Sequence, residues 1–527
     1  MKKIAVLLCS LIATLALFVS CASGNASGEG KKKGKSSIKT NPDYLNALDS
    51  GDYDSCIAYL ENKNAKNEKK QKDYIRDYFD IAMMQHLSKD YESSISNLNE
   101  VNQLMHDAFT VSITKATGAA LLNDNIADYA GHPYEYVYIN VFNALNYYNH
   151  GDVDEAAVEI RMLNEKQREF FSKYGEILEN YDPDKDIDDT TEENAEAKEG
   201  EEKTPVFSMD QALKSLNLNM ADYAAAKPEK STKGDIFRDS ALARYLSMIF
   251  YMMEKDPDSA KLDAATLKAL GSSYNPADDI AIPSGKGRLN ILAFTGLIGR
   301  RGEMRRIFGP IEGVHLDTGS GSVDIPPFDL EYAYPVFPAP QSYLYPVMEI
   351  AKVGDLPALS IEPGKVEITP MPANQIASVK VVMADGTELK TELVEDLNVA
   401  VAHDVNTRAR KAYNRSMARS ITKKFTLLMT SSAALYTAQS KGLPIGIHYV
   451  ALAKLVDTVD ATETADIRQV YALPSTAQAT AINLEPGTYS FKVQFLDEAG
   501  SVVEEKEFTD VAVTEDVPTL VEAICQK

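Results

Sequence analysis

The residue types best suited to catalysis or metal binding are scattered along this chain. Its seven histidines form no His-Glu-x-x-His motif and no other pair with the spacing of zinc ligands. They are His86, His106, His132, His150, His315, His403 and His448. There is also no Walker phosphate loop, no Gly-x-Ser-x-Gly elbow and no Gly-x-Gly-x-x-Gly motif after a strand. The sequence therefore predicts a protein that is not an enzyme and that uses no metal or cofactor.

One short motif does match a catalytic signature. Asp317-Thr318-Gly319-Ser320 resembles the active-site sequence of aspartic proteases, in which two carboxylates share one proton. A working protease site needs two such loops, and this chain contains one. Because the surrounding sequence GSGSVDIPP is typical of an exposed turn, we interpret the motif as a turn.

The N-terminus predicts export and lipid attachment. Two lysines precede an apolar run from Ile4 to Val19, which is the layout of a secretory signal peptide over residues 1–20. The run is short for a transmembrane helix. Val19-Ser20-Cys21 resembles the bacterial lipobox, which implies cleavage before Cys21 and acylation of that cysteine. A plain signal peptide with an incidental cysteine is the alternative.

The following residues predict a lipidated flexible tether over positions 21–40. This segment is rich in Gly, Ser and Lys and lacks apolar periodicity. Two or three acyl chains on one cysteine anchor a protein stably, whereas one does not. Ala22 follows the cysteine, and by resemblance to the sorting rules of bacteria with two membranes this favours the outer membrane, facing the periplasm. The predicted location is thus the cell envelope.

The net charge bears on which partners are expected, and the cysteine content on which disulfide could form. The chain of 527 residues has a net charge of −23, and loss of the two lysines of the signal peptide would make it −25. Nucleic acid is therefore not an expected partner, because phosphates require a basic surface. Besides the anchor, only Cys56 and Cys525 remain in the mature chain, and whether they pair is left open.

Residues 41–280 predict an α-helical domain containing a recurring element. The sequences GDYDSCIAYL, KDYESSISNL, GDVDEAAVEI and KDPDSAKLDA begin at Gly51, Lys89, Gly151 and Lys255, and each follows an apolar helical pattern. Each contains a turn, an aspartate suited to the start of a helix, and a small residue four positions after that aspartate. This pattern predicts helical hairpins. Residues 182–203, with eleven acidic residues against three lysines, predict a disordered acidic loop.

The recurring element resembles the tetratricopeptide repeat. Its spacings of 38, 62 and 104 residues are irregular, so the resemblance implies a degenerate array rather than a regular solenoid. Repeats of this kind bind extended peptides or helices through the first helix of each hairpin. By that analogy Tyr138, Phe142 and Tyr147 are candidate partner-binding residues. Unrelated helix pairs in an α-bundle are the alternative.

Beyond residue 285 the pattern changes from helical to strand-like. Alternating apolar residues and hairpin turns at Asp385-Gly386 and Ala499-Gly500 predict a β-rich domain over residues 285–527. One long helix is expected within it, from about residue 397 to 439. The predicted fold class is therefore α+β, with helical hairpins followed by a mainly antiparallel β domain with an inserted helix.

The inserted helix carries an unusual basic segment. Between Val405 and Lys424 there are seven basic residues and no acidic one. Arg408, Lys411, Arg415 and Arg419 are spaced so that they share one helical face. The face could be solvated or paired with acidic residues of the hairpins, or it could bind an anionic partner such as a lipid headgroup, a glycan or an acidic protein.

Three stretches together resemble a group of bacterial lipoproteins with degenerate tetratricopeptide hairpins and a C-terminal β domain. They are residues 132–163, residues 408–424, and residues 466–493, which contain the sequences DIRQVYALP and EPG. The resemblance implies no established reaction. We therefore expect a membrane-anchored envelope lipoprotein that acts as a non-enzymatic interaction scaffold or assembly adaptor for an envelope protein. The alternative is a peptidoglycan- or glycan-binding protein that uses the β domain and its basic helix.

Overall fold

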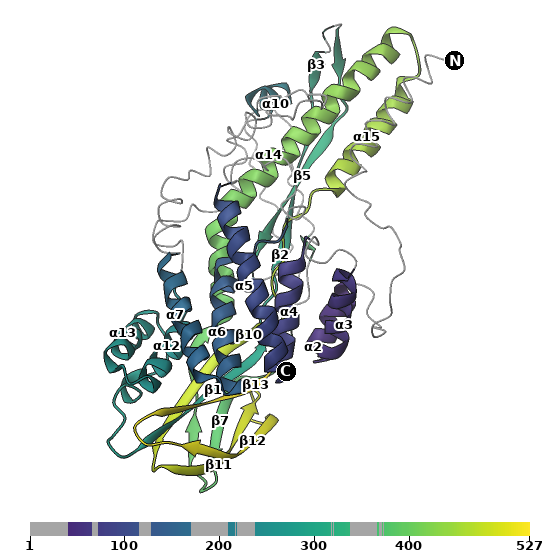
Figure 1. Cartoon of the computed structure of the whole chain (residues 1–527). Coiled ribbons are helices and arrows are strands. Elements are labelled where there is room, and N and C mark those ends of the chain that lie inside the picture. The colour runs from purple at the N-terminus through teal and green to yellow at the C-terminus, as the bar shows by residue number, and fades with distance from the viewer. Residues whose placement is uncertain are drawn as a thin grey trace.

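The computed structural model describes residues 41–65, 72–114, 128–169, 209–216, 218, 238–317, 319, 321–337, 366–367, 372 and 374–527 (Figure 1). Helices and sheets both contribute substantially, so the fold is of mixed α+β class, as expected. The expected signal peptide, Cys21, the expected tether and the expected acidic loop at residues 182–203 lie outside the described residues.

Most described helices before the first sheet form consecutive pairs that pack against each other. These pairs are α2 (Asn41–Asp49) with α3 (Tyr53–Asn64), α4 (Tyr74–Leu87) with α5 (Tyr91–Thr114), α6 (Pro133–His150) with α7 (Val153–Glu169), and α12 (Ala241–Met253) with α13 (Pro257–Ala269). A short helix, α10 (Met209–Ser215), packs elsewhere, against the long helix of the second half.

The four turns within these pairs share one backbone geometry. Gly51, Lys89, Gly151 and Lys255 all have positive φ, between 60° and 105°. In each turn the N–H of the following aspartate donates to the carbonyl five residues earlier, which closes the helix end in the Schellman pattern. A left-handed backbone conformation costs glycine little free energy and costs lysine more. The recurring sequence element therefore corresponds to a recurring turn.

The surroundings of the small residue in each element explain why that residue must be small. Cys56, Ser94, Ala156 and Ala260 are all completely buried. The Cys56 thiol donates to the carbonyl of Tyr44, and the Ser94 hydroxyl donates to the carbonyl of Ala82; in both cases the acceptor lies twelve residues earlier, on the first helix of the pair. These contacts show that the two helices approach closely at this position.

Two sheets follow the helices in layers, and the first of them packs against the helices. The first has the strand order β13–β1–β10–β9, and the second β12–β11–β7–β8. The bounds of the first are β1 (Gly287–Leu297), β9 (Glu392–Asp396), β10 (Pro474–Leu484) and β13 (Pro518–Cys525). Those of the second are β7 (Ser378–Met383), β8 (Glu388–Lys390), β11 (Gly487–Leu496) and β12 (Val502–Val513). Among the described strand pairs only β1 with β13 is parallel.

Strand β1 lies between two cores. All eleven of its residues are buried. Leu292 and Phe294 join the helical core, whereas Ile291 and Ala293 join the core between the two sheets. Successive strand residues point to opposite faces, so the order of layers is helices, first sheet, second sheet. The helices and the first sheet therefore share one hydrophobic core across the expected boundary at residues 280–285.

A third hydrophobic core builds an elongated arm (Figure 1). Its long helix α14 (Leu397–Ser440) matches the expected helix, and α15 (Ile445–Ala461) packs beside it. Also in the arm are β2 (Gly302–Ile311), β5 (Phe328–Val336), β6 (Val366–Glu367) and the β3–β4 hairpin (His315–Asp317, Ser322–Asp324). The sequence did not predict α15 as a separate helix. Among the described residues, no helix combines the length and apolar character needed to cross a bilayer.

Candidate functional site

The aromatic residues expected to face a partner lie mainly in the core. Tyr138 and Phe142, on α6, are 0% and 1% exposed. The Phe142 ring packs on Phe294 of β1, with 5.5 Å between ring centroids. Tyr147 is partly buried, and its hydroxyl accepts a hydrogen bond from Asn99 of the neighbouring helix. The expectation that Tyr138 and Phe142 contact a partner is therefore wrong, because the first sheet covers this face of α6.

The basic residues of α14 do not form one exposed face. Arg419 is 2% exposed and pairs with the buried Glu463 at 2.9 Å. Arg408 is half exposed and pairs with Asp404 at 3.1 Å, while Lys411 and Arg415 are partly buried. Only part of the expected anionic-partner face is thus accessible. Arg419 instead contributes to the arm's internal charge pairing.

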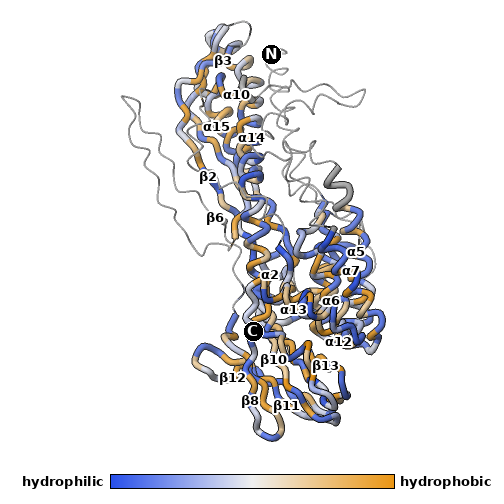
Figure 2. Tube along the Cα trace, turned by 90° about the vertical axis from the view of Figure 1, so that its left-hand side faces the viewer, coloured by the Kyte–Doolittle hydropathy of each residue, from blue (hydrophilic) through white to orange (hydrophobic). Residues whose placement is uncertain are grey.

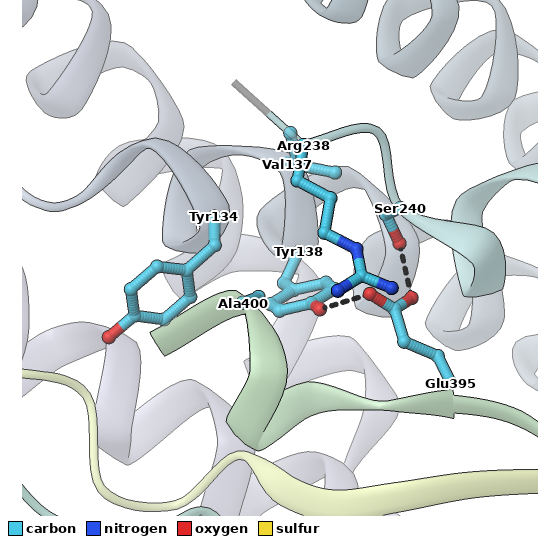
Figure 3. A pocket seen from close by; sticks show the side chains of 7 residues that line it. All are labelled: Tyr134, Val137, Tyr138, Arg238, Ser240, Glu395 and Ala400. Atoms are coloured by element: carbon cyan, nitrogen blue, oxygen red, sulfur yellow. Dashed lines mark hydrogen bonds between the residues drawn. The ribbon is translucent and has the colours of Figure 1, made fainter. Parts of the chain in front are cut away.

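A small cavity lies where α6, β9 and the start of α12 meet (Figure 3). The space open to the centre of a water molecule is about 10 Å³, which is at the lower limit for holding one water. The carboxylate of Glu395 accepts hydrogen bonds from the hydroxyls of Tyr138 and Ser240 and from the backbone N–H of Leu242. Burial raises the pKa of Glu395 above its usual range, and these donors act against that shift. The cluster joins a helix pair to the sheet.

Tyr138→Phe tests this structural role. The substitution removes one hydrogen bond to Glu395, so we expect the free energy of unfolding to fall by about 1–2 kcal/mol. Urea denaturation monitored by circular dichroism would measure it. Capture of any envelope partner should stay at the wild-type level; abolished capture with unchanged stability would restore Tyr138 as a binding residue.

The most extensive polar site holds the connection between α15 and β10. This segment, residues 462–473, includes the DIRQVYAL sequence that marked the family resemblance. One carboxylate oxygen of Asp80, on α4, accepts the backbone N–H groups of Tyr471 and Ala472 at 2.7 and 2.9 Å. Glu135, on α6, accepts the N–H of Val470 at 2.8 Å. Buried backbone donors need such partners, so the helices supply what a sheet would otherwise provide.

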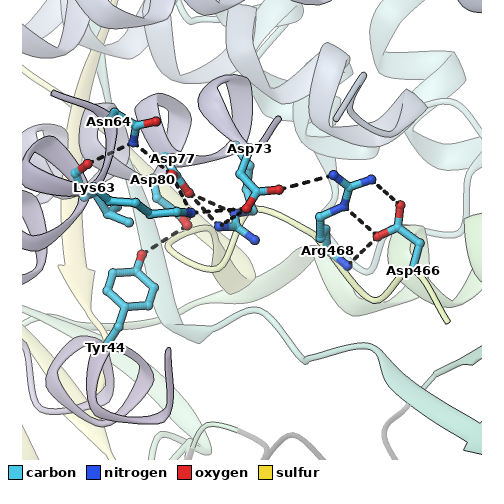
Figure 4. A network of polar contacts seen from close by, with 10 residues as sticks. Tyr44, Lys63, Asn64, Asp73, Asp77, Asp80, Asp466 and Arg468 are labelled. Carbon is cyan, nitrogen blue, oxygen red and sulfur yellow. Dashed lines mark hydrogen bonds and ion pairs between the residues drawn. The ribbon is translucent and has the colours of Figure 1, made fainter. Parts of the chain in front are cut away.

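Further charged residues fix the same segment (Figure 4). Arg468 pairs with Asp466 at 2.7 Å and with Asp73 of the α3–α4 connection at 3.2 Å. The neighbouring cations, Arg76 first among them, lower the pKa of Asp73 to about 2 despite its burial. Arg76 also pairs with the fully buried Asp77 at 2.6 Å. These pairs tie the first helices to a segment nearly four hundred residues later.

A second charge cluster joins the base of the arm to the helices. Asp404, on α14, lies 2.6 Å from Arg301, 3.1 Å from Arg408 and 3.2 Å from His132. Arg408, His132 and Arg301 hold the pKa of Asp404 well below its usual range despite its burial. Arg301 is 4% exposed and its guanidinium lies over the ring of Tyr134. Two arginines and one histidine thereby surround one buried carboxylate, which is an arrangement suited to holding elements together.

The remaining candidates lie apart from these clusters. Asp317 begins the protease-like motif on the exposed β3–β4 hairpin, where it accepts a hydrogen bond from the N–H of Gly319; Thr318 and Ser320 are outside the described residues. Cys56 and Cys525 are both buried free thiols, so they are not paired. Among the described residues, no three His, Cys, Asp or Glu side chains are arranged to hold a metal ion.

Comparisons of the chain with family models, curated proteins and solved structures found no match. The site is therefore interpreted from its own geometry. Sequence reasoning did not identify Asp80 or Glu135. The available signal was a lone carboxylate between buried aromatic and aliphatic residues, as in Phe79-Asp80-Ile81, which is costly unless buried donors surround it.

Proposed function

We propose that the protein is a lipoprotein, anchored in the bacterial envelope through acylated Cys21, that acts as a non-enzymatic protein-interaction scaffold. In this proposal the helix pairs are a degenerate tetratricopeptide-like array, followed by a mainly antiparallel β domain with an inserted helix. The observation that carries it is the shared turn at Gly51, Lys89, Gly151 and Lys255, together with a buried small residue in each pair. Repeated hairpins of this kind commonly serve as binding scaffolds.

The surface proposed for the partner differs from the one expected from the sequence. Helices α4 and α6 bind residues 470–472 of the same chain through Asp80 and Glu135. The face on which an array would take an extended peptide is thus filled internally. Among the described residues, the exposed side of α7 carries Val158 and Met162, which lie one helical turn apart and are each 39% exposed. Adjoining exposed apolar residues rimmed by polar ones can mark a protein-interaction site.

Site-specific photocrosslinking in living cells tests this proposal. A photoreactive side chain at Met162 of the full-length protein should give one dominant envelope protein adduct, and Val158→Glu should reduce it strongly. The same probe at Val502, an exposed apolar residue on β12, is the matched control. The proposal fails if Met162 gives no adduct, or if Val502 gives the same adduct in the same yield.

The anchor is tested separately. Cys21→Ser should abolish metabolic labelling with a fatty acid, because no acyl chain can then be attached. Unchanged labelling would contradict acylation at Cys21. The glycan-binding alternative depended on a continuous basic face, and the pairing of Arg408 with Asp404 and of Arg419 with Glu463 does not favour it.

A further inference from the structure

The turn between α14 and α15 carries exposed apolar residues. Ile447 is 73% exposed, Val450 60% and Leu443 42%. Ile447 is the most exposed of the large hydrophobic residues of the described chain, and the three lie within eight positions. Clusters of this kind mark contact with a partner or a membrane more often than scattered single residues do. We call Leu443, Ile447 and Val450 the arm tip.

The arm tip is not the packing face of α15. That face consists of Ile445, Tyr449, Leu452 and Val456, which belong to the core of the arm or pack against it. The hydroxyl of Tyr449 also donates to the carbonyl of Asp324, at the end of the β3–β4 hairpin. Ile447 and Val450, three residues apart, point the other way. The helix is therefore apolar on both sides at its start.

The segment of α14 and α15 that forms the arm tip has a charge opposite to that of the whole chain, while the neighbouring β3–β4 hairpin carries the exposed Asp324, which pairs with His315. From Val405 to Val456 there are nine lysines and arginines and no acidic residue, in a chain in which 77 of 527 residues are acidic. Several of these cations pair within the arm, but Lys441 and Lys454 flank the tip and are exposed. Lys454 lies one turn beyond Val450, and the first acidic residue, Asp457, lies almost one turn further.

The position of the tip suits a flat surface. The α14–α15 turn forms one extreme of the elongated molecule, and the second sheet lies at the opposite end (Figures 1 and 2). Exposed apolar residues flanked by exposed lysines at such an end match the composition of a segment that enters a bilayer interface with anionic headgroups. A surface that binds a protein pocket more often presents an aromatic anchor residue at the centre of a wider contact area.

We infer that the arm tip inserts into the interface of an anionic lipid bilayer, with Leu443, Ile447 and Val450 at the acyl boundary and Lys441 and Lys454 at the headgroups. This contact is peripheral and does not cross the bilayer. It is independent of acylation at Cys21, and it gives the protein a second membrane contact, on the arm.

Vesicle cosedimentation tests the inference with residues 22–527, which retain every described residue but no acyl chain. We expect binding to vesicles of phosphatidylglycerol and phosphatidylethanolamine and little binding to phosphatidylcholine alone. The double variant Ile447→Asp and Val450→Asp should weaken binding by about tenfold or more, because carboxylates oppose both insertion and anionic headgroups. Leu262→Asp, at a residue 66% exposed on α13, should leave binding unchanged.

A fluorescence measurement locates the contact directly, because the chain contains no tryptophan. Ile447→Trp should show a blue-shifted emission on addition of anionic vesicles and quenching by brominated lipid, whereas Leu262→Trp should show neither. Lys441→Glu with Lys454→Glu should weaken binding several-fold and reduce its salt dependence. The inference is overturned if the wild type ignores anionic vesicles, if Leu262→Asp weakens binding as much as the tip variant, or if Ile447→Trp emission does not change.

Discussion

Lys424→Met is expected to lower the free energy of unfolding by about 3–5 kcal/mol, because it leaves a buried carboxylate without its partner. The Lys424 side chain is 0% exposed, and its ammonium group lies 2.5 Å from Asp460 and 2.9 Å from the carbonyl of Asp329. Burial lowers the pKa of Lys424 and raises that of Asp460 to about 6. Each charge in this part of the arm therefore depends on the other.

The measurement is urea denaturation of the wild type and the variant, with hydrogen exchange of α14 and α15 to locate the effect. Adding Asp460→Asn to Lys424→Met should recover much of the loss, because the unpaired charge is then removed. Lys261→Met is the matched control, since its ion pair with Asp258 is solvent-exposed and should contribute at most about 0.5 kcal/mol. A Lys424→Met effect no larger than this control would contradict the assigned role.

The features that could be predicted from the sequence are those fixed by neighbouring residues. The hairpin turns were recognisable because a turn residue, an aspartate and a small residue act within a few positions of each other. The long helix was recognisable for the same reason, and it ends at Ser440, within one residue of the expected end. Both follow from local backbone chemistry.

The features that could not be predicted depend on what covers a helix. Tyr138 and Phe142 have the spacing of groove residues, but only the tertiary structure shows that β1 and β9 occupy that face. The spacing of Arg408 and Arg419 in the sequence places them on the same helical face. In the structure Arg408 is half exposed and pairs with Asp404 of the same helix, whereas Arg419 is buried and pairs with Glu463 after α15, so the two arginines do not form one accessible face. Periodicity identifies a face without identifying its neighbour.

The segment at residues 466–473 was recognisable in the sequence, but its structural role was not. Its sequence stood out as a motif, and its lack of a helical or strand pattern gave no indication of its role. In the structure it is an extended, largely buried connection whose backbone donors are satisfied by side chains from helices more than three hundred residues earlier. Such pairing leaves no periodic trace in the sequence, because single carboxylates supply it.

Asp80→Ala is expected to lower the free energy of unfolding by about 3 kcal/mol, because it removes the acceptor for this segment's backbone donors. The substitution leaves two buried N–H groups, of Tyr471 and Ala472, without an acceptor, and each costs about 1–3 kcal/mol. Asp80→Asn is the matched variant, because its amide oxygen can replace the carboxylate oxygen that accepts both bonds, and it should retain most of the stability. Equal losses in the two variants would contradict this account.

The wild type and Asp80→Asn should also differ in how the free energy of unfolding depends on pH. Burial raises the pKa of Asp80 to about 7, above the value near 3.9 expected in the unfolded chain. The folded state therefore binds more protons between these values, so this group's contribution to stability is full below about pH 4 and is lost as pH rises through 7. Between pH 5 and 8 the wild type should lose about 2–3 kcal/mol more than Asp80→Asn, in which this titration is absent. Urea denaturation of both proteins across that range measures the difference, and parallel curves would show that Asp80 is ionised in the folded protein throughout.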